Sequence, residues 1–374
     1  MKLFFFSLTI LVVVGAYLWH SKQTGWSVTI VSMIRNEEAA MPRFLASARQ
    51  MTANVMFCDT GSTDATLQLI RGYPVFHHNW TDDFSKNRNL CLKSVLPHIK
   101  TDYVLLLDAD HTIEPLDVRK RPEYDMNMIR MRGNYLPYLI RTRRLRSCVY
   151  RGVTHEFLDC GEGVRSGHYD GIALHHHEDG SHRAEKYEKD RVRLEKGYKK
   201  ESDPHLRIRY GFYLARTYEA LKLWDKAIEW YEKRAHWEGW KQEVWFSKYR
   251  RAFCMLYTKN YTTKQVDEAF LEAYNDDPHR KEPLYYLALM HRERQDFASC
   301  LLYGRAGLLI GSPDAYALFV DQDVYEWQLE EEVAMCLWYS GRKEEARGHW
   351  KRVYNNPYAS EEVHERMENN LMMW

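Results

Sequence analysis

The sequence predicts an α/β domain built on a largely parallel sheet, followed by an all-α domain of repeated helical hairpins. Between residues 26 and 110, short apolar or β-branched runs alternate with helical stretches. This is the order expected of βαβ units. From residue 183 onward the pattern is helical throughout, and small residues recur at a spacing of twelve. We therefore place the two domains at residues 26–183 and 184–374, behind a separate segment at 1–22.

Bulk composition describes an ordinary globular protein. Hydrophobic residues make up 45% and charged residues 28% of the 374 positions, which excludes a disordered chain. The formal net charge is +1, so no global field attracts nucleic acid, and we expect no nucleic-acid partner. The seven cysteines are scattered without a CxxC pair. Their spacing argues against a zinc ribbon and a dense disulfide framework, and it leaves the cellular compartment open.

Residues 1–22 predict a single-pass membrane anchor. The run 3–19 is apolar with two exceptions, and this length is near the lower limit for a helix that spans a bilayer. A cleaved signal peptide is the alternative, because Val14-Gly15-Ala16 offers a small-residue cleavage site. We favour an uncleaved anchor, since the apolar run is long and only Lys2 precedes it. The flanking charges nearly balance, so the side of the membrane stays open.

The α/β domain begins with three predicted strands, at residues 26–33, 54–58 and 73–77. Each is followed by a polar turn that leads into a helical stretch. The region 127–177 differs, because it contains short β-like pieces and no obvious long helix. This pattern suits antiparallel strands that complete the sheet and close over a site.

The apolar run 103–107 leads directly into Asp108 and Asp110. A continuous apolar run of this length indicates a strand that is buried on both faces. The two carboxylates then lie at its carboxyl end, where open α/β sheets bind ligands. Carboxylates in such a position suit a hard divalent cation that also contacts phosphates. The alternative is a strand followed by an Asp-rich turn.

The helical domain carries an internal repeat. Three alanines are each followed by a small residue twelve positions later: Ala215 by Ala227, Ala288 by Cys300, and Ala334 by Ala346. Small residues allow the two helices of a hairpin to approach closely, and large ones fill the gaps. We expect about four hairpins, including a weaker unit at 249–278. An irregular helical domain is the alternative.

The order of these pieces resembles family-2 glycosyltransferases of the GT-A fold. More narrowly, it is similar to the branch in which a short transferase domain precedes tetratricopeptide (TPR) repeats. The resemblance rests on six motifs, at residues 32–38, 59–64, 80–89, 107–110, 152–156 and 175–180. It implies a GT-A (Rossmann-like) nucleotide-sugar transferase domain followed by TPR-like repeats. The implied reaction moves a sugar, with inversion, from a nucleotide-diphospho-sugar to a glycan, lipid-linked or protein acceptor. A UDP-sugar is the commonest donor in the family.

The resemblance also implies a donor site. It assigns the base and ribose to four residues: Arg35, Asn36, Glu37 and Asp59. Arg88 would neutralise the diphosphate, with Lys86 as a further candidate. The alternatives are a plain helix start for the first three residues, a turn residue for Asp59 and a solvated helix residue for Arg88.

Asp108 and Asp110 match the family's DxD motif, which implies a divalent metal cofactor, Mn²⁺ or Mg²⁺. Asp108 also contacts the ribose in many relatives. A late histidine often completes the metal ligands, and His175 is our first choice among His175, His176 and His177. Glu156 is the candidate general base that takes the proton of the acceptor hydroxyl. The acidic pair of many relatives is replaced by His155-Glu156 here, so Asp159 stays open as an alternative.

Two other functions compete with an active transferase. A transferase-like domain without activity could serve, with the repeats, as a scaffold that binds protein or glycan partners. A nucleotidyltransferase would need a glycine-rich phosphate loop after the first strand, and residues 32–40 contain no glycine. The concave face of stacked hairpins suggests a protein partner in addition to the substrates.

Overall fold

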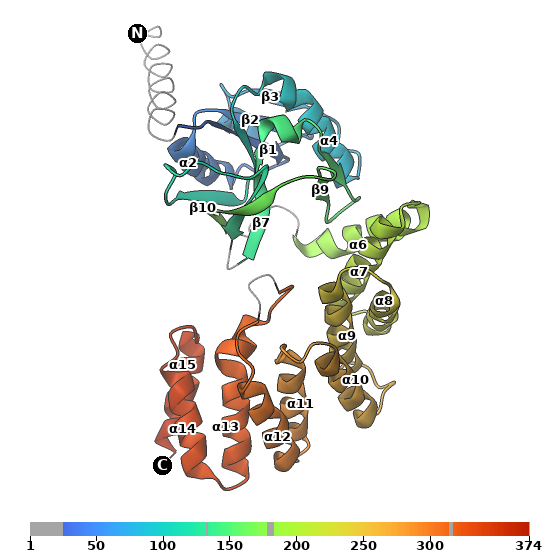
Figure 1. The fold of residues 1–374 in the computed structure, drawn as a ribbon, viewed down its shortest axis with the longest axis vertical. Helices are drawn as coiled ribbons and strands as arrows, with labels where there is room; N and C mark the ends of the chain where they lie inside the picture. Colours follow the sequence, from blue (N-terminus) through green and yellow to red (C-terminus); the bar gives the residue numbers. More distant parts are fainter. Residues whose placement is uncertain (1–24, 132–133, 178–182, 314–316, 374) are drawn as a thin grey trace. The chain divides into compact units, whose positions relative to one another are not determined.

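A computed structural model describes residues 25–131, 134–177, 183–313 and 317–373 (Figure 1). The chain divides into two compact units after Glu201. The predicted division after residue 183 differs, because helix α6 (Arg183–Lys200) belongs to the first unit. The predicted anchor at 1–22 lies outside the described residues. Within those that are described, no helix is long and apolar enough to cross a bilayer.

The first unit contains a mixed eight-stranded sheet in the order β3-β2-β1-β4-β7-β6-β10-β5 (Figure 1). Four parallel strands form one half: β1 (Val28–Ile34), β2 (Val55–Asp59), β3 (Val75–His77) and β4 (Tyr103–Leu106). The other half consists of β5 (His111–Pro115), β6 (Met126–Met131), β7 (Asn134–Arg141) and β10 (Ser166–His176). Strand β7 is antiparallel to both β4 and β6. The predicted parallel sheet with antiparallel additions is confirmed, although β7 was not predicted.

The long helices of this unit are α2 (Met41–Met51), α4 (Phe84–Val95) and α6. The short ones are α3 (Thr66–Leu69), the 3₁₀ turn η1 (Leu96–His98) and α5 (Thr142–Leu145). A separate antiparallel ribbon pairs β8 (Val149–Arg151) with β9 (Phe157–Asp159).

Strands β1 and β4 are buried on both faces, as the apolar runs predicted. Ile30 and Leu105 pack with Phe44 of α2 on one face. Val104 packs with Leu92 of α4 on the other. Each buried aliphatic side chain contributes about 1.5–3 kcal/mol. The centre of the sheet is therefore rigid, and it fixes the positions of the loops at the carboxyl ends of these strands.

Three disulfides are present, which the sequence analysis did not predict; in a chain of 374 residues they do not form a dense framework. The pairs are Cys58–Cys91, Cys148–Cys160 and Cys300–Cys336, and Cys254 is free and buried. Cys58 lies in β2 and Cys91 on α4, with a sequence separation of 33 and 5.6 Å between their Cα atoms. Packing of the helix against the sheet creates this proximity, so the sequence spacing contains no sign of it.

The second unit is helical. Its helices are α7 (Pro204–Ala220), α8 (Trp224–His236), α9 (Lys241–Met255), α10 (Thr263–Asp276), α11 (Glu282–Glu293), α12 (Phe297–Leu308), the π-helical turn η2 (Val324–Gln328), α13 (Leu329–Tyr339), α14 (Lys343–Tyr354) and α15 (Glu361–Met372). Within the described residues, α7 to α14 pair in sequence as four hairpins, and α15 packs on α14.

The small residues of the repeat lie where the prediction placed them. All six side chains at the twelve-residue spacing are fully buried. Gly307 marks another close approach, because a Cβ there would lie 2.7 Å from Leu329 Cδ2. Cys300, one of the predicted small residues, also joins α12 to α13 through its disulfide with Cys336.

Candidate active site

A pocket of about 910 Å³ lies at the carboxyl ends of β1 and β4. Arg35 and Glu37 line it from the loop after β1, and Asp108 and Asp110 from the loop after β4. Arg88 of α4 and Glu156 add to it. The parallel strands and their crossover helices thus bring together side chains that lie more than a hundred residues apart.

Arg88 connects two of the predicted site carboxylates. Its Nε donates a hydrogen bond to Glu156 Oε1 at 2.5 Å, and its Nη2 contacts both oxygens of Asp108 at 3.0 and 3.2 Å. The Arg88 side chain is 18% exposed and that of Glu156 is 12% exposed. Burial alone would lower the pKa of Arg88, but Asp108 and Glu156 outweigh it and raise that pKa. Arg88 is therefore a bridge between carboxylates, a role that the sequence did not predict.

Asp110 lies between two histidines. His176 Nε2 is 2.9 Å from Asp110 Oδ2, and His111 Nδ1 is 3.1 Å from Asp110 Oδ1. The two imidazole rings stack with centroids 4.9 Å apart. Burial alone would raise the pKa of Asp110, but these histidines outweigh it and lower the pKa to about 2. Asp110 is therefore ionised at neutral pH.

The structure corrects our first choice among the three histidines. Adjacent residues of a strand point to opposite faces, and His175 and His176 both lie in β10. His175 Nε2 pairs with Glu114 at 2.8 Å, away from Asp110, and does not line the pocket. His176 lines the pocket and contacts Asp110. The candidate ligand is therefore His176.

Asp59 and Asn36 hold together the loops after β2 and β1, and Asn36 also lines the pocket. Asp59 is 3% exposed and accepts hydrogen bonds from the backbone amides of Gly61 and Ser62. The Asn36 side chain accepts from the Thr63 amide at 2.7 Å. Asn36 itself has a φ of +54°, a conformation that asparagine tolerates better than most residues. The predicted base-binding role of Asp59 is not supported by its position, because it does not line the pocket.

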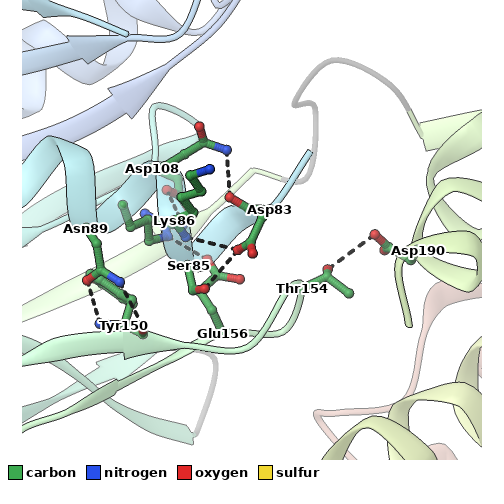
Figure 2. Close-up of polar contacts among 11 residues, drawn as sticks. Asp83, Ser85, Lys86, Asn89, Asp108, Tyr150, Thr154, Glu156 and Asp190 are labelled. Atoms are coloured by element: carbon green, nitrogen blue, oxygen red, sulfur yellow. Dashed lines mark hydrogen bonds and ion pairs between the residues drawn. The ribbon is translucent and has the colours of Figure 1, made fainter. Parts of the chain in front are cut away.

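The loop that carries Glu156 is fastened to the start of α4. The Asn89 side chain donates to Tyr150 O at 2.9 Å and accepts from Tyr150 N at 2.8 Å (Figure 2). The Phe84 amide donates to Val153 O at 2.9 Å. Gly152 has a φ of +106°, and a Cβ there would lie 3.3 Å from the Glu156 Cα. These contacts hold the segment 152–156 against the segment 80–89.

Helix α6 forms a further wall of the pocket, through Lys186, Tyr187 and Lys189. Asp190 is 3% exposed and accepts a hydrogen bond from Thr154 Oγ1 at 3.2 Å (Figure 2). Burial raises the pKa of Asp190, although Arg193 and Lys186 act against that rise. The helix is therefore fixed to the loop of Glu156.

Sequence reasoning missed His111 and the α6 residues as parts of the site. His111 is 5% exposed and directly follows Asp110 of the DxD motif. That adjacency in the sequence could have marked it as a site residue. Helix α6 has an ordinary charged sequence, and no local signal marked its contribution. Lys86 and Asp159, the two further candidates, do not line the pocket.

Part of the first unit is similar to a known protein family. Residues 29–123 match the family described as Glycosyl transferase family 2. The first unit contains a family-2 glycosyltransferase domain. The matched stretch of this domain includes Arg88, Asp108 and Asp110 and ends before Glu156 and His176. The roles of the latter two therefore depend on the geometry alone.

The repeats have relatives of their own. A TPR repeat-containing protein of Synechococcus elongatus is 33% identical over 88 residues, which are 23% of this chain and 21% of that protein. The match thus spans about a fifth of the relative's length. MamA has a TM-score of 0.36 at 12% identity, over 49% of this chain and 91% of that chain. A thermophilic TPR protein of Thermus thermophilus has a TM-score of 0.35 at 12% identity, over 50% and 92%.

TM-scores this low carry no argument about the helical unit. Its architecture follows from the packing of its own hairpins. The chain combines a family-2 glycosyltransferase domain with C-terminal TPR-like repeats.

Proposed function

We propose that this protein is a metal-dependent, inverting glycosyltransferase that uses a nucleotide-diphospho-sugar, with a UDP-sugar as the first candidate. The observation that carries the proposal is the meeting of Asp108, Asp110 and Glu156 in one pocket at the strand ends of a family-2 domain. Ligand binding at that edge is the rule for open α/β sheets. Arg35, Asn36 and Glu37 line the same pocket and are the proposed contacts to the nucleoside.

The donor set around Asp110 fits a divalent cation. Asp110 Oδ1 is buried, with His111 Nδ1 3.1 Å away, and Asp110 Oδ2 lies 2.9 Å from His176 Nε2. Asp110 and His176 would hold Mn²⁺ or Mg²⁺, with Asp108 as a further oxygen ligand. Within the described residues no group of three potential ligands is preassembled. Bound there, the cation would stabilise the negative charge of the departing nucleoside diphosphate.

Glu156 is the proposed general base. Its carboxylate lies at the pocket wall, oriented by Arg88 and by the left-handed backbone of Gly152 and His155. A base so placed takes the proton of the acceptor hydroxyl as that hydroxyl attacks, and proton transfer of this kind contributes a factor of about 10²–10⁴. Arg88 keeps Asp108 and Glu156 from repelling each other before substrate binds.

We also propose a location and a partner class. Three disulfides indicate an oxidising compartment, so residues 1–22 would anchor a chain whose two units lie outside the cytosol. The helical hairpins would bind a protein partner or the acceptor. The acceptor is a hydroxyl of a glycan, a lipid-linked sugar or a protein glycan.

Release of nucleoside diphosphate from a panel of nucleotide sugars, with Mn²⁺ or with EDTA, tests this function. We expect metal-dependent release, loss of donor binding in Asp110→Ala, and retained donor binding with at least about 100-fold slower turnover in Glu156→Gln. His176→Ala and His175→Ala form a matched pair, of which only the first should impair activity.

The inactive scaffold remains the competing function. The pairing of Arg88 with both Asp108 and Glu156 favours it, because both carboxylates are occupied in the structure. Absence of turnover and of donor binding across the whole panel, in the presence of metal, would decide for the scaffold.

A further inference from the structure

We propose that Lys186 and Lys189 of α6 bind phosphate oxyanions of the substrate that enters the pocket. The inference depends on the proposed glycosyltransferase function and deepens it. It assigns to α6 the anion-binding role that Arg88 was predicted to have.

The two lysines lie on one face of the helix. Residues three apart on a helix are neighbours on its surface, and both side chains line the pocket that Asp108 and Glu156 also line. Both are exposed, so their ammonium groups retain the mobility needed to follow a ligand. Lys189 pairs with Glu185 at 2.7 Å, with the two side chains 48% and 73% exposed. An exposed pair of this kind contributes little and is released at little cost.

Arg88 is poorly suited to the role. Its guanidinium already contacts Glu156 and both oxygens of Asp108. Transferring it to a diphosphate would leave two neighbouring carboxylates unpaired in a partly buried site, which is costly. Another cation must therefore balance an incoming anion.

The charges of the pocket point to the lysines. On the sheet side, two arginines face four carboxylates, a net of −2: Arg35 and Arg88 against Glu37, Asp108, Asp110 and Glu156. On α6, the cations that line the pocket are Lys186, Lys189 and Arg193, beside the carboxylate of Asp190. Arg193 is already paired with Asp82, and Lys189 with the exposed Glu185. Lys186, and Lys189 once it is released from Glu185, therefore supply the positive charge. A divalent cation at Asp110 would neutralise the sheet side. The positive charge of α6 then remains for the anionic substrate.

Helix α6 is a fixed platform for these two side chains. Asp190 accepts from Thr154, and Arg193 pairs with Asp82 at 2.7 Å. The Arg193 guanidinium also lies over the rings of Trp80 and Phe84, 5.9 and 5.3 Å from their centroids. Because the backbone is held in place, only the lysine side chains are ordered on binding, which limits the entropic cost.

Phosphate oxyanions in this pocket have two possible sources, the diphosphate of the donor or an anionic group of the acceptor. Calorimetric titration of the full-length protein with UDP and with inorganic pyrophosphate, both with Mg²⁺ at low salt, tests the proposal. We expect the double variant Lys186→Gln/Lys189→Gln to bind at least one probe about tenfold more weakly, the sum of two partly exposed charge contacts.

Two variants serve as controls. Lys199→Gln removes an exposed lysine of the same helix that does not line the pocket, and it should leave both affinities unchanged. Lys186→Arg/Lys189→Arg keeps both charges and should restore binding.

The competition between probes identifies the source. Displacement of UDP by pyrophosphate supports the donor diphosphate. Pyrophosphate binding to the UDP-saturated protein, lost in the Gln double variant, supports an anionic acceptor.

Wild-type affinities in the Gln double variant, an equal loss in Lys199→Gln, or no binding of either probe to the wild type would overturn the proposal. Lysine-dependent pyrophosphate binding without turnover of any nucleotide sugar would support it while rejecting the proposed catalytic function. The two failures are therefore distinguishable.

Discussion

Two aspartates at the carboxyl ends of β2 and β4 differ in role because their partners differ. Asp59, at the end of β2, is satisfied by backbone amides of its own turn and by His77 Nδ1 at 3.3 Å. Asp110 lines the pocket, where His111 and His176 lie beside its two oxygens. The first arrangement stabilises a loop, whereas the second presents a carboxylate to the pocket, where we propose that a cation binds.

Replacement of Asp59 by asparagine tests its structural role. Burial alone would raise the pKa of Asp59, but hydrogen bonds from Ser62, Gly61 and His77 outweigh it and lower that pKa. We expect Asp59→Asn to reduce the free energy of unfolding at pH 7 by about 2 kcal/mol, since hydrogen bonds to a charged group are lost. Urea unfolding measures this change.

The difference in unfolding free energy between the wild type and Asp59→Asn should depend on pH. A carboxylate with a lowered folded pKa contributes stability above its unfolded pKa of about 3.9, and the contribution is lost as pH falls through the folded value. The difference between wild type and Asp59→Asn should therefore shrink below about pH 4. A difference that is constant from pH 3 to 7 would contradict this account.

Among the elements, α4 does most to assemble the site. Its start holds the loop of Glu156 through Phe84 and Asn89, and its Arg88 holds two carboxylates. Its Cys91 joins it to β2. One helix thus connects the sheet, the DxD loop and the general-base loop.

Removal of the Cys58–Cys91 disulfide should loosen this helix. We expect Cys58→Ala/Cys91→Ala to lower the free energy of unfolding by about 3 kcal/mol, because the closed loop spans 33 residues. Thermal unfolding with and without a reductant measures the effect. The reductant should destabilise the wild type more than the variant, since the variant has already lost this bond. Equal effects would show that this disulfide contributes nothing.

At the scale of the whole molecule, the sheet unit contains every candidate catalytic residue, and the helical unit contains the repeats. Disulfides occur in both units. The oxidising compartment that we propose from these bonds would therefore contain both units, and residues 1–22 are the proposed anchor.

Deletion of residues 1–22 tests the anchor. We expect the shortened protein to move from the membrane fraction to the soluble fraction and to retain its nucleotide-sugar activity, because no candidate site residue precedes Arg35. Fractionation followed by the activity assay measures both. A shortened protein that stays with the membrane would show that a second membrane contact exists.

Much of the fold was predictable because its signals are local. The apolar runs that became β1, β2 and β4 and the twelve-residue spacing of small residues each reflect burial that adjacent elements impose. Strand β7 was missed because its residues lie in a region of short, irregular β-like pieces. The boundary after Glu201 was missed because α6 has the charged pattern of an ordinary helix.

The sequence by itself determined the class of each unit and the two carboxylates that follow a strand, since these follow from residue type and order; Glu156 as the base stays a prediction from the family resemblance. Only the tertiary structure decided that His176 faces Asp110, that Arg88 joins Asp108 to Glu156, that three cysteine pairs meet, and that α6 lines the pocket. Each of these depends on which face of an element turns toward a distant partner. That orientation is set by the packing of the whole unit, and no local stretch of sequence encodes it.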